Sequence, residues 1–110
     1  MAEKKGVATG EKLNLENLAG YQDGAVVSRT VVDKPVGTIT AFAFDAGEGL
    51  SEHTVPYDAF DQVLDGEAQI TIDGKVQSVS AGEIVIMPAN KPHSLRAVQR
   101  FKMLLVMIRA

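Results

Sequence analysis

Residues 47–66 read GEGLSEHTVPYDAFDQVLDG and hold one of only two histidines in a chain of 110 residues. Glycines at both ends of this stretch predict turns, because glycine adopts backbone conformations that other residues avoid. Between the turns lie an imidazole, His53, and an acidic residue, Asp61, next to segments that have the pattern of strands. The stretch therefore places polar groups that can bind a ligand beside regular structure.

The rest of the chain consists of short runs with the composition or the alternation of β-strands. These runs cover residues 25–32, 37–44, 67–72, 75–80, 83–87 and 101–108. Asp73-Gly74 is a strong signal for a two-residue hairpin turn between the third and fourth runs, and Asp33-Lys34-Pro35 separates the first two. The sequence contains no helical period of ten residues with caps. We therefore predict an all-β sandwich or barrel of eight to ten strands.

The two ends of the chain differ in character. Residues 1–12 are polar and charged without a hydrophobic period, which predicts a flexible N-terminal arm. Three leucines between residues 13 and 18 fit either a short edge strand or one turn of helix. The run 101–108 is apolar on both faces, as in a strand that is central in a sandwich or buried in a subunit contact. We expect a single domain over residues 13–110, since this length suits one core.

Composition narrows the possible partners and the compartment. The formal charge of −3 and the scattered Lys and Arg residues give no basic surface, so we expect no nucleic-acid partner. The chain has no cysteine, which excludes disulfides, thiolate catalysis and Cys-ligated metals and is compatible with a reducing cytoplasm. It has no run of eighteen apolar residues and no signal-peptide pattern. We expect a cytoplasmic protein without a membrane partner.

The two histidine segments resemble the motifs of the small single-domain cupins, the cupin type-2 conserved barrel family. In that family the first motif has the order Gly, His-x-His, Glu, Gly, and the second has the order Gly, Pro-x-Gly, His, Asn, each at fixed spacing. Matching residues at that spacing are Gly47, His53 and Gly66 for the first motif and Gly82, Pro88 and His93 for the second. The resemblance begins near Gly37 and runs to the C-terminus. It implies a cupin-type double-stranded β-helix, that is, a jelly-roll barrel.

The resemblance also implies a metal site, and here the sequence departs from the family. Cupins bind a divalent metal through the two histidines and the glutamate of the first motif and the histidine of the second. His53 and His93 match two of these ligands, but Val55 and Ala59 occupy the other two positions. Each lost ligand must be replaced by water, which weakens binding. We therefore expect either no cofactor or one weakly bound divalent metal (Fe, Mn, Ni, Cu or Zn).

Asp61 is the residue that could compensate for the missing carboxylate. It lies two residues beyond Ala59, so in a strand both side chains point to the same face, and the family register turns that face inward. Asp61 would then be a third metal ligand, a proton-transfer group or a hydrogen-bonding anchor. A one-residue bulge after Pro56 would instead turn Phe60 inward and leave Asp61 in solvent.

Other residues near the expected barrel mouth are weaker candidates. Tyr57 and Asp58 follow Pro56 and could contact a ligand, or could be surface loop residues. Three methionines lie in apolar strands and are expected to pack in the core, because a thioether suits only a soft metal such as Cu(I). They are Met87, Met103 and Met107.

Three functions fit these observations. The first is a cupin that binds a small polar molecule through His53, Tyr57, Asp61 and His93, with a depleted metal site. The second is a metal-dependent enzyme, such as a dioxygenase or an isomerase of a small oxygenated substrate, in which His53 and His93 hold the metal and His53, His93 and Asp61 are the catalytic candidates. The third is a non-catalytic structural or regulatory protein. In each case we expect a homodimer that covers the apolar run 101–108.

Overall fold

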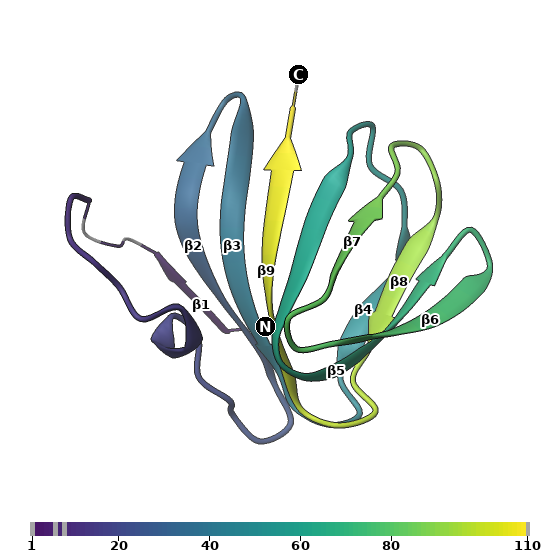
Figure 1. Ribbon diagram of the computed structural model, residues 1–110, viewed down its shortest axis with the longest axis horizontal. Helices are drawn as coiled ribbons and strands as arrows, with labels where there is room; N and C mark the ends of the chain where they lie inside the picture. The colour runs from purple at the N-terminus through teal and green to yellow at the C-terminus, as the bar shows by residue number, and fades with distance from the viewer. Residues whose placement is uncertain (1, 6, 8, 110) are drawn as a thin grey trace.

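The computed structural model describes residues 2–5, 7 and 9–109 and consists almost wholly of strands (Figure 1). The elements are β1 (Ala2–Lys5), the 3-10 helix η1 (Leu15–Asn17), β2 (Val26–Lys34), β3 (Gly37–Phe44), β4 (Gly49–His53), β5 (Ala59–Ile72), β6 (Lys75–Ser80), β7 (Ile84–Met87), β8 (His93–Arg96) and β9 (Phe101–Ile108). The nine strands of the described residues agree with the eight to ten predicted. No helix among these residues is long and apolar enough to cross a membrane.

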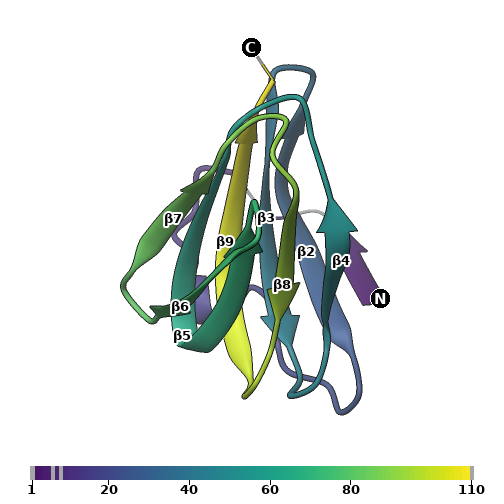
Figure 2. The ribbon, with the colours of Figure 1, turned by 90° about the vertical axis from the view of Figure 1, so that its right-hand side faces the viewer.

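The strands form two sheets that share β5. One sheet, sheet A, has the order β1-β2-β3-β9-β5-β7, and the other, sheet B, contains β4, β8, β5 and β6. Seen from the side, the sheets curl around a common interior (Figure 2). This is the predicted all-β jelly roll, and both predicted hairpins are present. In the second hairpin Asp73 (φ 49°) and Gly74 (φ 81°) both have positive φ, as a two-residue hairpin turn of the favoured type requires.

Gly66 is the point at which β5 passes from one sheet to the other. The strand is 14 residues long. Its first part pairs with β7 and β9 as far as Gly66, and its second part pairs with β6 and β8 from Glu67 onward. Gly66 has a φ of 72°, and a Cβ atom at this position would overlap the carbonyl oxygen of Arg100. The closing glycine of the first motif is therefore required by the fold.

The main core fills the space between the two sheets. At the closed end Phe44 stacks on Phe101 with ring centroids 4.4 Å apart. Toward the other end the interior is lined by smaller and more flexible side chains, among them Ala59, Met87 and Met103. Most residues of this core are aliphatic, and its open end is the region that holds the histidines.

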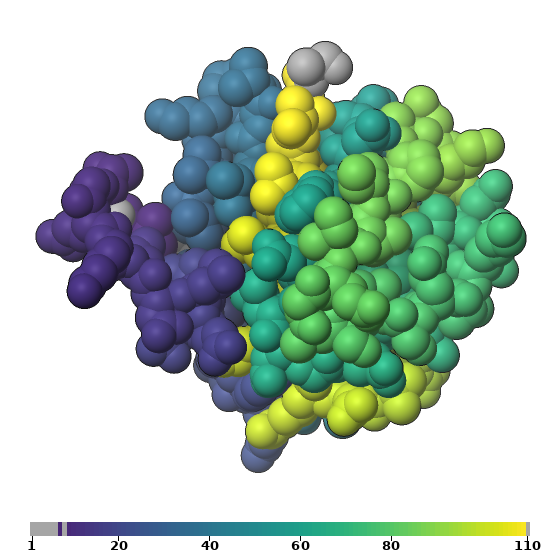
Figure 3. Space-filling model, in the orientation of Figure 1, coloured from purple at the N-terminus to yellow at the C-terminus, as the bar shows by residue number. Residues whose placement is uncertain are grey.

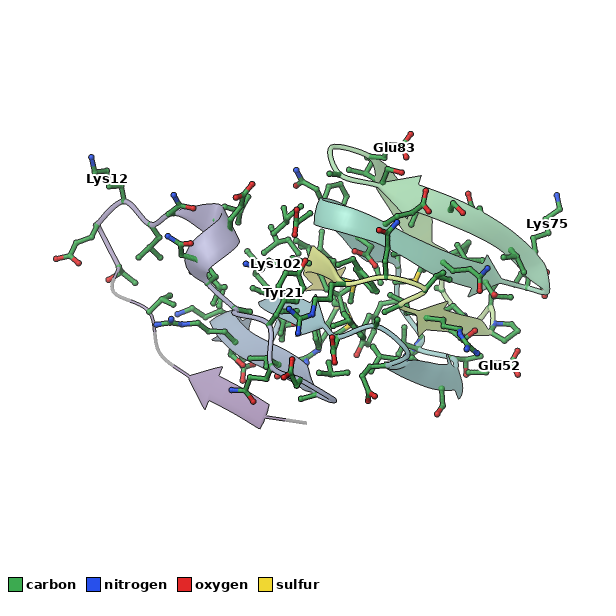
Figure 4. The ribbon with its side chains drawn as sticks, turned by 90° about the horizontal axis from the view of Figure 1, so that it is seen from below. Lys12, Tyr21, Glu52, Lys75, Glu83 and Lys102 are labelled. Atoms are coloured by element: carbon green, nitrogen blue, oxygen red, sulfur yellow. The ribbon has the colours of Figure 1, made fainter. Side chains whose placement is uncertain are left out.

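A second core lies on the outer face of sheet A and is covered by the N-terminal segment. Leu18 and Ala19 pack against Val27, Ala41 and Ala43. Tyr21 and Lys102 meet beside this core, with the Lys102 ammonium 5.0 Å from the ring centroid (Figure 4). Part of the outer face that the sequence assigned to a partner subunit is thus covered by the chain itself.

The N-terminal residues contain one strand and one short helix. Ala2–Lys5, within the segment predicted to be an arm, form β1, which pairs in parallel with β2 and so satisfies an edge of the sheet. The flexibility of residues 1–12 stays a prediction. The leucine-containing segment forms one turn of 3-10 helix, with the side chain of Asn14 accepting a hydrogen bond from the Glu16 amide at 3.1 Å.

The requirement for glycine at the bend can be tested by substitution. Gly66→Ala should lower the free energy of unfolding by about 2–4 kcal/mol, because it adds both backbone strain and an overlap with the Arg100 carbonyl. Gly74→Ala is the matched control, since φ there is also positive but nothing lies within 4 Å of the added methyl group. Urea unfolding measures both. Equal losses in the two variants would show that the overlap at Gly66 has no effect.

Candidate functional site

The two predicted histidines lie together at the open end of the barrel. His53 is the last residue of β4 and His93 the first of β8, and they are direct partners across the two strands. Their Nε2 atoms are 3.1 Å apart, and the rings meet edge to face with centroids 4.4 Å apart. The sequence predicted both residues, and the antiparallel pairing of β4 with β8 explains why positions 40 apart in the chain meet.

The contacts of the other ring nitrogens fix the roles of these Nε2 atoms. Nδ1 of His53 is 2.6 Å from the Ser51 carbonyl oxygen, and Nδ1 of His93 is 3.3 Å from that of Lys91. A carbonyl oxygen only accepts hydrogen bonds, so each Nδ1 carries the proton. In a neutral pair, both Nε2 atoms then present lone pairs toward each other. Such a pair is stabilised by a hydrogen-bond donor or a cation placed between the lone pairs.

Burial favours the neutral form of His93. Its side chain is 3% exposed, whereas His53 is exposed. Removal from water lowers the pKa of His93, and repulsion from the His53 ring when that ring is positively charged lowers it further. The electrostatics of the site therefore favour the uncharged form of His93.

A cavity of about 260 Å³ extends from the two imidazoles into the barrel. Apart from the histidines its lining is apolar. Three methionines contribute, namely Met87, Met103 and Met107. The other lining residues are Phe42, Leu50, Val55, Ala59, Leu95 and Leu105. The site thus combines one polar end with a long apolar interior.

The four positions of the family metal site keep their places around this cavity, but only two carry donor atoms. Val55 and Ala59 line the cavity beside His53 and His93. Among the residues that the structure describes, no group of three His, Cys, Asp or Glu side chains could hold a metal ion. The donors present therefore do not fit the family's divalent ion, for which two imidazoles lack both a third ligand and a balancing negative charge.

Asp61 faces the interior, as the register without a bulge predicted. It alternates with the inward-facing Ala59 and Val63, and its side chain is fully buried. Neither carboxylate oxygen has a hydrogen-bond partner among the residues that the structure describes, and burial raises the pKa of Asp61 to about 7. The structure does not join Asp61 to the histidines as a third ligand, and it is absent from the lining of the cavity.

Tyr57 and Asp58 lie elsewhere. The Tyr57 ring lies under the Arg109 guanidinium, 6.0 Å away, and Tyr57 lines a groove on the outer face of sheet A. Asp58 accepts a hydrogen bond from the Ala89 amide at 2.8 Å and so ties the start of β5 to the loop before β8. Neither residue lines the cavity with the histidines.

The second motif keeps its loop shape despite two departures from the family. Asn90, where glycine is usual, has a φ of 64°, a conformation that asparagine tolerates better than most residues. Ala97, where asparagine is usual, is fully buried and makes two backbone hydrogen bonds, to Glu48 at 2.8 Å and from Gly47 at 2.7 Å. The backbone therefore supplies the contact between the motifs.

Sequence reasoning missed the methionines as site residues. It placed them in the core, and the structure places three of them in the wall of the cavity. Their positions along the strands could have indicated that they lie near the histidines. Met87 ends the strand just before the His93 loop, and Met107 lies near the end of the last strand.

The chain resembles known proteins both in sequence and in structure. Residues 41–108 match the model of the cupin domain. A conserved protein of unknown function from Streptococcus pyogenes is 34% identical with a TM-score of 0.91, over 100% of this chain and 96% of that one. A cupin 2 conserved barrel domain protein from Leptotrichia buccalis is 41% identical with a TM-score of 0.85, over 87% of this chain and 47% of that one.

A cupin superfamily protein from Desulfitobacterium hafniense is 28% identical with a TM-score of 0.88, over 94% of this chain and 95% of that one. The search among curated proteins found no match. These similar structures thus support the fold along nearly the whole chain.

The buried carboxyl of Asp61 makes stability depend on pH. The pKa of Asp61 in the folded state is raised from 3.8 to about 7, so ionisation of this carboxyl lowers the free energy of unfolding. This loss of stability is absent below pH 3.8 and grows until the pH passes 7. At full ionisation this cost is on the order of 4 kcal/mol. Asp61→Asn should therefore gain stability relative to the wild type as pH rises from 5 to 8, measured by urea unfolding. The exposed Asp33→Asn is the control, and a parallel change in both variants would contradict the assignment.

Proposed function

Because the chain belongs to the cupin family, we propose that it binds a small molecule inside its barrel, with an apolar body in the cavity and one hydrogen-bond donor at His53 and His93. The observation that carries this proposal is the pair of Nε2 atoms, 3.1 Å apart, at one end of an apolar cavity. Ligand sites in proteins commonly combine an apolar lining with a few convergent polar groups.

The size and lining of the cavity support a ligand with one ring. A dry cavity of about 150 Å³ holds benzene. The cavity here is about 260 Å³, which leaves room for a ring with one or two substituents. Its nine apolar lining residues, out of eleven, favour a ligand whose body is apolar. This refines the prediction made from the sequence, which was a small polar molecule.

The protonation of the imidazoles indicates which polar group the ligand carries. With both Nδ1 protons directed at carbonyl oxygens, both Nε2 atoms accept hydrogen bonds when the two rings are neutral. A hydroxyl group donates to such a pair, whereas a carboxylate does not, because it has no proton to give. Phenolic compounds combine this donor with an apolar ring of suitable size.

The alternative of an enzyme that uses a divalent metal has less support. It needs a third ligand, and the described residues supply no group of three acidic, histidine or cysteine side chains. Asp61, the expected substitute, is buried without a hydrogen-bond partner and away from the cavity lining.

The expected homodimer remains a proposal, and the outer face of sheet A supports it. A row of apolar residues crosses five strands on this face at directly paired positions: Ile86, Phe60, Val106, Ile39 and Val32. Strand β9 lies along this face between β3 and β5 (Figure 3). Ile86 is 55% exposed and Val32 36%, and the three residues between them are half-buried, so the row is most accessible to solvent at its two ends. Apolar surfaces of this kind mark protein–protein contacts.

The charges at the two ends of this face suit a second copy of the chain. Lys34 and Arg109 lie at the end where β9 finishes, and Arg109 contacts the Lys34 carbonyl. Glu83, labelled in Figure 4, precedes β7 at the opposite end, where its carboxylate accepts a hydrogen bond from the Ser80 amide at 2.8 Å. A twofold arrangement with opposed strand directions brings the basic end of each copy to the acidic end of the other.

The ligand proposal is tested with metal-stripped protein and two probes of one size. Para-cresol should bind saturably and about tenfold more tightly than toluene, because only the phenol donates to the imidazoles. In His53→Leu this preference should vanish, whereas Thr54→Ala, at the exposed neighbouring position, should keep it. Methyl chemical shifts measured by NMR give the dissociation constants. Absence of saturable binding by both probes, or an unchanged preference in His53→Leu, would refute the proposal.

The dimer is tested by placing a charge in the middle of the apolar row. The wild type should sediment at twice its chain mass of 11.7 kDa, and Val106→Lys should weaken association by about tenfold or more. Val76→Lys is the control, because Val76 is 60% exposed on β6, which belongs to the other sheet. Analytical ultracentrifugation distinguishes the masses. A monomeric wild type, or equal weakening by both substitutions, contradicts this interface.

A further inference from the structure

The open end of the cavity gathers nitrogen and sulfur donors without any carboxylate. Its lining holds two imidazoles and the thioethers of methionines, while the acidic and second histidine positions of the family carry Ala59 and Val55. We propose that His53, His93, Met87 and Met107 form a binding site for the soft monovalent ion Cu(I). The proposal concerns the same cavity as the proposed function but does not depend on a small molecule being bound there.

The imidazole pair has the geometry of two ligands to one ion. The two Nε2 atoms are 3.1 Å apart, and both Nδ1 atoms contact backbone carbonyls, which hold the rings in place. Two nitrogens bound to one metal ion at about 2.0–2.1 Å each can lie at most about 4.2 Å apart. The observed separation falls within this limit, so no large movement is needed to admit an ion.

The two methionines flank the position that the family carboxylate would occupy. Ala59 pairs with Met87 on β7 on one side and with Met107 on β9 on the other. Residues directly opposite on neighbouring strands share a face, with Cβ atoms about 4.5–5.5 Å apart. All three line the cavity that also contains the histidines. The space left by the missing carboxylate is therefore bordered by thioethers from both sides.

All of these residues lie at the same end of the barrel because of where their strands begin and end. His53 ends β4, His93 begins β8, Met87 ends β7 and Ala59 begins β5. Met107 is the last residue but one of β9. Met103, the third methionine of the lining, lies four residues earlier on β9, opposite Val63, and so belongs to a deeper part of the cavity.

The chemistry of the donors selects among metals. Thioether and imidazole donors suit Cu(I), whereas carboxylate and water suit hard divalent ions. The donor set is neutral, and transferring an ion from water into an apolar interior becomes much more costly as its charge rises. A monovalent soft ion is thus the species that this apolar cavity with four neutral donors accommodates best.

The competing interpretation is that the methionines only fill space in the core, which flexible thioether side chains do well. The two interpretations differ in a measurable way. If Met87 and Met107 serve only packing, leucine can replace them without changing metal affinity, because Met to Leu nearly conserves volume.

The test uses tag-free, full-length protein under anaerobic conditions, titrated with Cu(I) against the chromophoric chelator bicinchoninate. The wild type should bind one Cu(I), and the double variant Met87→Leu/Met107→Leu should bind it at least about tenfold more weakly. Met103→Leu is the matched control: it makes the same change in the same cavity and should keep the wild-type affinity. Circular dichroism verifies that each variant is folded.

X-ray absorption at the copper edge provides a second readout, with nitrogen and sulfur scatterers expected in the wild type and nitrogen alone in the double variant. Equal Cu(I) affinity in the wild type and the double variant would overturn the proposal, as would Zn(II) binding that is tighter than Cu(I) binding. Failure of para-cresol to bind metal-stripped protein refutes the proposed function and leaves this result unaffected, so the two proposals fail separately.

Discussion

The passage of β5 from one sheet to the other at Gly66 is the constraint on which the rest of the structure depends. One continuous strand contributes to both sheets, so the bend determines how the second sheet closes over the first. The turn needs a positive φ and the close approach of the Arg100 carbonyl, and only glycine permits both. At the opposite, open end, the strand termini converge and bring together His53, His93 and the residues around them.

The site keeps the residue positions of the family metal centre, but two of its side chains differ from the family ligands. Two ligand positions are apolar, and the remaining imidazoles direct lone pairs at each other instead of at a carboxylate-balanced ion. Removing a buried charge lowers the cost of an apolar cavity, which explains how the same barrel can hold an apolar ligand body. The methionines around Ala59 add soft donors where a hard one is missing.

Asp61 is an exception, because it is a buried group that can carry a charge. A fully buried carboxyl without a hydrogen-bond partner destabilises the folded state whenever it is ionised. The pKa of Asp61 is raised for the same reason, since burial favours the uncharged acid. The residue lies on the same inner face as Ala59, but it does not line the cavity.

The sequence by itself determined the all-β class, the two hairpins and the cupin frame, because turn residues and motif spacing are local and fixed along the chain. It also identified His53 and His93, but it left open whether Asp61 faces inward, since a one-residue bulge reverses the facing of a strand. Only the tertiary structure decided that the two imidazoles face each other and that Asp61 stays apart from them. It also decided that Tyr57 lies on the outer face and that Met87 and Met107 flank Ala59. These depend on the pairing of strands distant in sequence, and strand register across a sheet is set by the packing of the whole core.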